Sequence, residues 1–194
     1  MSVRISAGDQ KGRLLRTPRR AATRPSSAKL RAALFNILGS RIAGARWLDL
    51  FAGSGVIGLE ALCRGAAAAT FVDEHPEACR CIEDNIRMLG CGDRAVVRCL
   101  PVRRFLASGA AAEAACDLVF ADPPYGDSAR ADQLDDLLRL CEQSAMITPR
   151  AWLLIEHAAR TTPPTRGGRW RAIRTYTYGD SALTLYQPDQ PIQS

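Results

Sequence analysis

Residues 48–58, Leu48-Asp49-Leu50-Phe51-Ala52-Gly53-Ser54-Gly55-Val56-Ile57-Gly58, contain the signal that decides the fold. An apolar run from Trp47 to Phe51 enters a turn with the pattern G-x-G-x-x-G, and a helix is expected from Val56 to Arg64. Asp73 follows Gly53 by twenty residues, at the end of the next expected strand. This spacing predicts a strand, turn and helix unit whose backbone approaches a nucleoside cofactor closely.

Strands and helices alternate along the rest of the chain. After a strand at 69–73, Pro76 and Glu77 begin a helix that ends near Gly90. Further strands are expected at 95–98, 118–121 and 152–156, with a helix at 130–144. This alternation predicts a parallel sheet with helices on both faces. Residues 171–177 and 182–186 flank a Gly-Asp turn, so we expect an α/β fold with a mostly parallel sheet that ends in an antiparallel hairpin.

The N-terminal region differs from the rest in charge. Residues 1–46 carry eleven Lys or Arg and one acid, a net charge of +10, which leaves −4 for residues 47–194. Residues 4–8 and 12–15 are expected to form two short strands, and Ser26 or Ser27 to cap a helix with an apolar face at Leu30, Leu34, Ile37 and Leu38. We divide the chain into a basic extension, residues 1–40, and a main domain, residues 41–189.

A basic extension on a mildly acidic body is typical of polyanion binding, because phosphate contacts release counterions. A solvated tail is the alternative. The candidates for contact with a polyanion are Arg4, Lys11, Arg13, Arg24, Lys29 and Arg31.

Composition excludes several classes of protein. With 194 residues, 47% hydrophobic and 24% charged, the chain is globular in character, and it has neither a signal-peptide core nor an apolar run of roughly 18 residues that would span a bilayer. We therefore expect a cytoplasmic protein, acting as a monomer. The seven cysteines are scattered without C-x-x-C pairs, and His75 and His157 stand alone, so we expect free thiols and no metal site.

Asp49 selects the cofactor. A carboxylate at the tip of the strand would repel a pyrophosphate but attract an ammonium or sulfonium group, and S-adenosylmethionine carries both cations. We assign Asp49 to the amino-acid end of this cofactor and Asp73 to its ribose hydroxyls, with Glu74 as a near-equivalent candidate. The turn backbone would hold the methionine and ribose portions, through Phe51, Ala52, Gly53, Ser54 and Gly55. Two alternatives stay open: Asp49 only caps the turn, or the chain is an NAD enzyme.

A second loop, Asp122-Pro123-Pro124-Tyr125, follows the apolar strand at 118–121, at the edge where open α/β sheets bind ligands. Asp122 and the Pro123 carbonyl can accept the two N–H groups of an exocyclic base amine, which orients it for attack on a methyl group. The prolines stiffen the loop, and Tyr125 offers a ring on which the base stacks. A paired base cannot reach this slot, so the target is unpaired or flipped. An ordinary Asp-Pro-Pro turn is the alternative.

The two loops together resemble those of the class I amino-methyltransferases. More narrowly, the chain resembles the RsmD-type bacterial enzymes that methylate guanine N2 in small-subunit (16S) ribosomal RNA. The resemblance runs from residue 4 to about 187 and is carried by Arg4-Ile5-Ser6-Ala7-Gly8, Lys11-Gly12-Arg13, Thr23-Arg24-Pro25-Ser26, Leu34-Phe35-Asn36-Ile37-Leu38 and Gly58-Leu59-Glu60-Ala61-Leu62-Cys63-Arg64-Gly65-Ala66. It implies a seven-stranded sheet, S-adenosylmethionine as cofactor, and ribosomal RNA or a small-subunit particle as partner.

Some residues fit this interpretation less directly. The family usually has a small polar or acidic residue after the third strand, near the cofactor adenine, whereas this chain has Cys99-Leu100-Pro101-Val102, so we assign no side chain there. His157 could act as a general base, but a structural role is favoured because methylation already makes the amine proton acidic. A second acid-free stretch could extend the RNA surface or form a solvated edge, and its arginines are Arg160, Arg166, Arg169, Arg171 and Arg174.

The sequence therefore predicts an S-adenosylmethionine-dependent enzyme that methylates a guanine N2 amine in 16S ribosomal RNA, with Asp122, Pro123, Pro124 and Tyr125 handling the base. Two rivals stay open. One is a methyltransferase acting on an adenine or cytosine amine of DNA or RNA, and the other is a catalytically silent RNA-binding or ribosome-assembly protein with the same fold.

Overall fold

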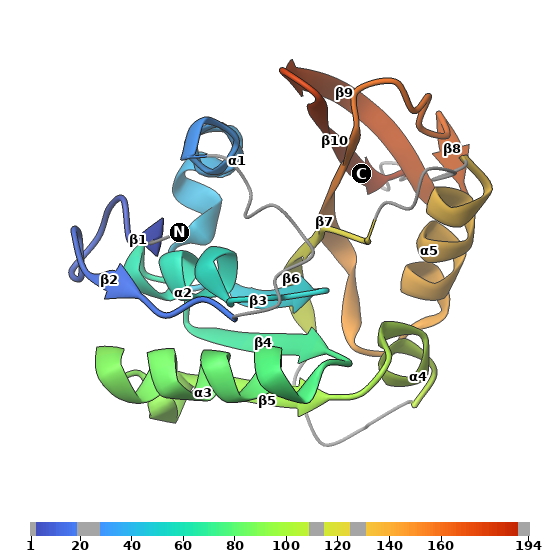
Figure 1. Ribbon diagram of the computed structural model, residues 1–194. Helices are drawn as coiled ribbons and strands as arrows, with labels where there is room; N and C mark the ends of the chain where they lie inside the picture. The colour runs from blue at the N-terminus through green and yellow to red at the C-terminus, as the bar shows by residue number, and fades with distance from the viewer. Residues whose placement is uncertain (1–2, 19–27, 109–114, 125–130, 190–194) are drawn as a thin grey trace.

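The computed structural model describes residues 3–18, 28–108, 115–124 and 131–189. Its main feature is a twisted sheet with the strand order β5-β4-β3-β6-β7-β10-β9-β8 (Figure 1). The parallel part consists of β3 (Arg46–Leu50), β4 (Ala68–Asp73), β5 (Ala95–Cys99), β6 (Cys116–Ala121) and the first strand of the C-terminal region, β7 (Ile147–Ala158). The predicted α/β fold and the mostly parallel sheet are thus confirmed.

The C-terminal hairpin is also confirmed. Strands β9 (Trp170–Tyr178) and β10 (Ser181–Pro188) pair antiparallel on either side of the Gly179-Asp180 turn, and β10 pairs antiparallel with β7. The two-residue strand β8 (Arg166–Gly167) adds a short eighth strand beyond β9, so the described sheet exceeds the seven strands expected. A bulge between Leu185 and Tyr186 shifts the register of β10 on β9.

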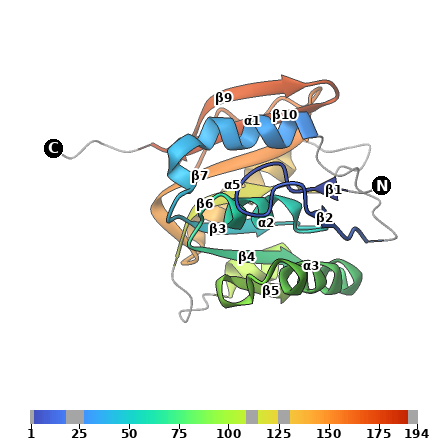
Figure 2. The same ribbon diagram turned by 90° about the vertical axis from the view of Figure 1, so that its left-hand side faces the viewer.

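Helices cover both faces of the sheet. One apolar cluster joins the sheet to α1 (Ala28–Leu38), α2 (Val56–Cys63) and α3 (Pro76–Leu89), and a second joins the opposite face to α4 (Val102–Ala107) and α5 (Ala131–Gln143). Figure 2 shows α1 against the β7 to β10 side of the sheet and α3 near β4 and β5. Short 3-10 turns follow α1 and α3, at Gly39–Ile42 and Gly92–Arg94. Helix α4 was not among the expected elements.

Sequence patterns account for the helix boundaries. Pro76 occupies the start of α3, where its missing N–H costs no hydrogen bond, and Gly90 ends the helix with a φ of +66°. The apolar face expected for the helix after residue 27 is found in α1, where Leu30, Leu34 and Leu38 are buried. The proposed caps Ser26 and Ser27 lie outside the described residues.

The N-terminal extension shares the main core. Strands β1 (Val3–Arg4) and β2 (Leu14–Leu15) form an antiparallel hairpin beside α2 (Figure 1). Val3, Ile5 and Leu15 belong to the same apolar cluster as Trp47 of β3 and Leu34 of α1. At these three residues the extension therefore packs into the apolar cluster of the main domain. No helix among the described residues is both long and apolar enough to cross a membrane.

Candidate active site

The two candidate loops leave neighbouring strands at the same edge of the sheet. Strands β3 and β6 are adjacent and parallel, and Leu50 pairs with Ala121. Directly after this pair, the backbone N–H of Asp122 donates to the carbonyl of Leu50 at 3.3 Å. The glycine-rich turn and the Asp-Pro-Pro turn thus begin side by side, as a shared cleft requires. Asp122 and Pro123 are partly buried and Pro124 is exposed, whereas Tyr125 lies outside the described residues.

The glycine-rich turn is held in a defined shape. Phe51 has a φ of +59° and is the one non-glycine residue with positive φ in the described part of the chain, while Gly53 and Gly55 have φ of +55° and +73°. A left-handed conformation at a phenylalanine costs on the order of 1–3 kcal/mol and is typical of functional turns. The N–H of Ala52 donates to Val72 of β4 at 3.0 Å, so β4 fixes the turn from the side.

Asp49 is buried beneath this turn, with 1% of the residue exposed. Its Oδ2 accepts the N–H of Gly58, in the first turn of α2, at 2.9 Å. One carboxylate oxygen therefore accepts a backbone N–H in the first turn of α2, and the contact of Asp49 with the amino-acid end of the cofactor stays a prediction. A Cβ on Gly58 would lie 2.4 Å from Cε1 of Phe71 and 3.1 Å from Asp49 Oδ2, so the third glycine permits this contact. Burial raises the pKa of Asp49 to about 8, and the nearby charge of Asp73 adds to the shift while the Gly58 N–H opposes it.

Asp73 and Glu74 differ sharply in environment. Asp73 is 7% exposed, and its Oδ2 accepts the N–H of Gly53 at 2.8 Å. Its Oδ1 accepts the backbone N–H of His75 at 2.9 Å and lies 3.1 Å from the ring Nδ1 of the same residue. Glu74 is exposed. Asp73 thus orders the turn in this structure, and a contact between either acid and the ribose hydroxyls stays a prediction.

Three carboxylates gather at this edge. Burial raises the pKa of Asp122 well above its ordinary range, and the negative charges of Glu156 and then Asp49 raise it further. Glu156 is itself buried near the end of β7. Buried like charges oppose one another's ionisation, and an added cation relieves that opposition. The geometry is therefore suited to a positively charged ligand and poorly suited to a pyrophosphate.

His157 points to the other face of the sheet from Glu156, because successive residues of a strand alternate. The residue is buried, with Nε2 2.7 Å from the hydroxyl of Thr184 and Nδ1 3.0 Å from the carbonyl of Ala158. Burial lowers its pKa. These contacts favour the structural role over that of a general base.

Glu60 fastens the extension to the main domain. This fully buried residue of α2 accepts hydrogen bonds from the Ser6 hydroxyl and from Arg64 Nη2, the latter at 2.7 Å. Arg31 Nε of α1 lies 3.5 Å from the second carboxylate oxygen. The sequence motif that contains Glu60 did not indicate its role, although a spacing of four residues from Arg64 is typical of an ion pair on one helix face.

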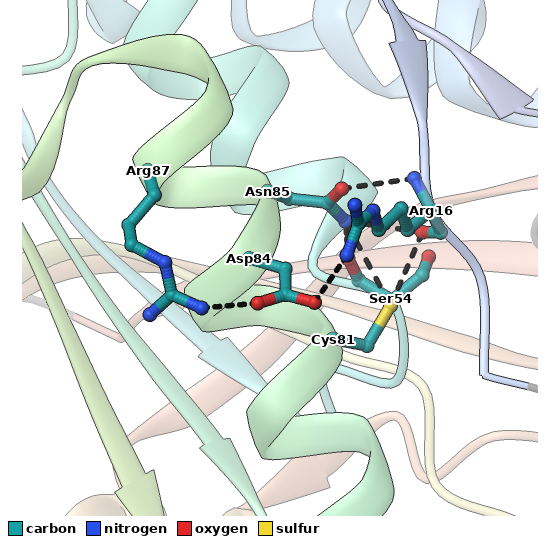
Figure 3. Close-up of polar contacts among 6 residues, drawn as sticks. All are labelled: Arg16, Ser54, Cys81, Asp84, Asn85 and Arg87. Carbon is teal, nitrogen blue, oxygen red and sulfur yellow. Dashed lines mark hydrogen bonds and ion pairs between the residues drawn. The ribbon is translucent and has the colours of Figure 1, made fainter.

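Asn85 links the extension to the cofactor turn (Figure 3). This fully buried residue of α3 accepts the N–H of Arg16 at 2.9 Å and donates to the Arg16 carbonyl at 3.0 Å and the Ser54 carbonyl at 3.2 Å. At the surface, Asp84 pairs with the side chains of Arg16 and Arg87. Sequence reasoning missed Asn85 too. Its polar amide within the apolar stripe of α3 was the available signal.

The predicted RNA contacts separate into three groups. Arg4, Lys11, Arg13 and Lys29 are exposed, as a docking surface requires. Arg24 lies outside the described residues. The prediction for Arg31 is wrong: the residue is 6% exposed, and its guanidinium is turned inward to Glu60 and to the Arg4 carbonyl. Its charge stabilises a buried carboxylate rather than a phosphate.

Comparison with known proteins gives the family. A family model described as Conserved hypothetical protein 95 matches residues 3–187. The chain belongs to this family. The putative rRNA methyltransferase YlbH of Bacillus subtilis (strain 168) is 32% identical to it over 185 residues, which cover 95% of this chain and 98% of that protein. The ribosomal RNA small subunit methyltransferase D of Escherichia coli (strain K12) is 33% identical over 185 residues, which cover 95% and 89%.

A solved structure supports the same membership in the Conserved hypothetical protein 95 family. The putative methyltransferase yhhF of Escherichia coli superposes with a TM-score of 0.81 at 32% identity, covering 97% of this chain and 98% of that one. The resemblance inferred from the sequence motifs is thereby confirmed over nearly the whole chain.

Proposed function

We propose that this protein transfers a methyl group from S-adenosylmethionine to the exocyclic N2 amine of a guanine in 16S ribosomal RNA. The observation that carries the proposal is the juxtaposition of the two turns, fixed by the hydrogen bond from Asp122 N to the Leu50 carbonyl. Family membership supports the substrate class, since the relatives are named as methyltransferases of ribosomal RNA.

The site fits this cofactor on chemical grounds. Asp49, Asp122 and Glu156 place three buried carboxyl groups at one edge of the sheet, and the two cations of S-adenosylmethionine would stabilise their ionised forms. The turn at 51–55 brings its backbone close to a nucleoside without side chains at the two glycines. When bound, the cofactor supplies a methyl group made electrophilic by the sulfonium.

The chain's own residues orient the amine. Asp122 would accept one N–H of the guanine N2 group and the Pro123 carbonyl the other, which directs the nitrogen lone pair toward the methyl carbon. A nitrogen–carbon bond would form as the carbon–sulfur bond breaks, and the methylated amine would then release its proton to water. Proline at 123 and 124 limits backbone motion in the turn. Tyr125 is proposed as a stacking surface for the base.

Methylation of purified small-subunit particles and of protein-free 16S RNA, followed by mapping of the modified nucleotide, tests this proposal. We expect one N2-methylguanine, and we expect Asp122→Ala, which removes the acceptor oxygen, to lower the rate by about 10²-fold or more, on the order of one lost transition-state contact. Methylated adenine or cytosine, or activity restricted to DNA, would favour the first rival. Normal RNA binding with no methyl transfer to any substrate would favour the silent binding protein.

A further inference from the structure

Strand β9 presents an aromatic and basic face on the same side of the sheet as Glu156, in the cross-sheet row of the acceptor turn. Tyr176 pairs with Leu183 of β10, and Leu183 pairs with Glu156 of β7. Directly paired residues in a sheet point to the same face, so Glu156 and Tyr176 share one face. Ala121 pairs with Ile155, which puts Asp122 at the level of Glu156. Tyr176 thus lies three strands from Asp122 in the same cross-sheet row, on the order of 14 Å away at the usual strand spacing.

Tyr176 is partly exposed and does not fill the core, unlike the buried Trp170 and Tyr186 of the same hairpin. The guanidinium carbon of Arg174, two residues earlier on the same face, lies 5.0 Å from its ring centroid. Tyr178 follows on that face as well, next to the turn. An arginine beside an accessible tyrosine ring is a surface on which an unpaired base can stack, because every base has a π face.

The charges around this face favour a polyanion. No acidic residue occurs between His157 and Gly179, whereas that stretch contains five arginines. Arg166 and Arg171 pair with Asp189, and the backbone N–H of Arg169 donates to the carboxylate of Glu142. Arg174 forms no ion pair with another described residue, so its charge is available there for a phosphate. Lys29 is exposed on the first turn of α1, a helix whose apolar face belongs to the same cluster as Leu183.

We propose that Tyr176 and Arg174 hold an unpaired nucleotide adjacent to the target guanine, with the base on the Tyr176 ring and the phosphate on Arg174. This inference rests on the proposed function, since it takes single-stranded ribosomal RNA as the ligand. It assigns to β9 the task of keeping the flanking strand open while Asp122 receives the target amine. The partner of this surface is RNA rather than a ribosomal protein.

The test compares Tyr176→Ala with Tyr176→Phe, which keeps the ring, and with Thr177→Ala, an exposed change on the opposite face of the strand. The ligand is a protein-free 16S RNA fragment that contains the mapped target. Loss of one stacking contact should weaken binding and raise KM by about 5- to 150-fold in Tyr176→Ala. Tyr176→Phe and Thr177→Ala should bind as the unaltered protein does, and the affinity for S-adenosylmethionine should be equal in all four proteins.

Unchanged RNA affinity in Tyr176→Ala would overturn the inference, as would a loss in Tyr176→Phe equal to that in Tyr176→Ala, which would implicate the hydroxyl. A defect seen only with assembled particles would also overturn it and point to a protein partner. These outcomes are distinct from failure of the proposed function, which would appear as absent ribosomal RNA methylation by the unaltered protein.

Discussion

The buried carboxyl of Asp49 makes cofactor binding depend on pH. In the folded protein without a ligand, burial holds its pKa at about 8, so the group is mostly protonated below that pH. A sulfonium or ammonium ligand favours the ionised form and therefore has to displace the proton. We expect S-adenosylmethionine to bind more tightly as pH rises toward 8, with release of close to one proton per molecule bound.

The size of the effect follows from the ionised fraction. With a pKa of about 8, that fraction is roughly 0.3% at pH 5.5 and roughly 9% at pH 7, so the dissociation constant should fall by about 30-fold over this range. The change is equivalent to about 2 kcal/mol. In Asp49→Asn the amide oxygen can still accept the Gly58 N–H, but the titrating group is gone.

Isothermal titration calorimetry in two buffers of different ionisation enthalpy measures both the affinity and the number of protons released. Asp49→Asn should bind the cofactor weakly, and its affinity should depend little on pH. Asp84→Asn, which removes a surface carboxylate, should keep the pH dependence of the unaltered protein. An affinity that does not change between pH 5.5 and 7 in the unaltered protein would refute the reasoning. If the affinity of Asp49→Asn changed with pH as much as that of the unaltered protein, the proton released on binding would come from another group, such as Asp122.

Three further predictions concern the packing around the site. Gly58→Ala should lower the free energy of unfolding by about 1–3 kcal/mol in urea titrations, because the added methyl group meets Phe71. Gly92→Ala is the control: the nearest atom lies 3.9 Å from the added carbon, so the loss of unfolding free energy should be less than half as large. Glu60→Gln should destabilise the fold by about 3–5 kcal/mol and speed amide exchange in the N-terminal hairpin, whereas removing the surface acid Asp84 should cost at most about 1 kcal/mol. Asn85→Ala leaves the Ser54 carbonyl without its amide donor, so cofactor affinity should fall by about 2- to 12-fold, the equivalent of one hydrogen bond; an unchanged affinity would show that the turn holds its shape alone.

Local patterns were sufficient for most of the fold and for the main loops. The glycine-rich turn identified β3 as the strand that begins the parallel unit, whereas the order of the strands within the sheet comes from the structure. The side-by-side placement of Asp49 and Asp122 followed from the rule that parallel strands end at one edge. Helix α4 was missed because its six residues are too few for a periodic pattern, and the two-residue β8 is shorter still.

The errors and omissions in the site arise from long-range pairing. Arg31 was expected on the surface with the other basic residues, and only its approach to Glu60, twenty-nine positions later in the chain, explains its burial. Asn85 likewise gains its role from Arg16, sixty-nine positions away. Charge and periodicity describe one segment at a time. Charge and periodicity therefore identified the basic residues and the amphipathic helices. They did not identify the buried acid or amide side chain with which a distant residue forms an ion pair or hydrogen bond.

Ionisation of Asp49 favours binding of a cation but lowers the stability of the folded protein. Its carboxyl titrates at an ordinary value of 3.8 when unfolded and at about 8 in the folded protein, so the folded state binds more protons between these values. Stability from this group is therefore complete below pH 4 and falls as pH rises toward 8, by at most about 1.4 kcal/mol per pH unit. A cationic ligand opposes this loss because it stabilises the ionised form. The same concentration of S-adenosylmethionine should consequently raise the melting temperature more at pH 7 than at pH 6. An equal rise at both pH values would show that the Asp49 carboxylate does not interact with the cation of the ligand.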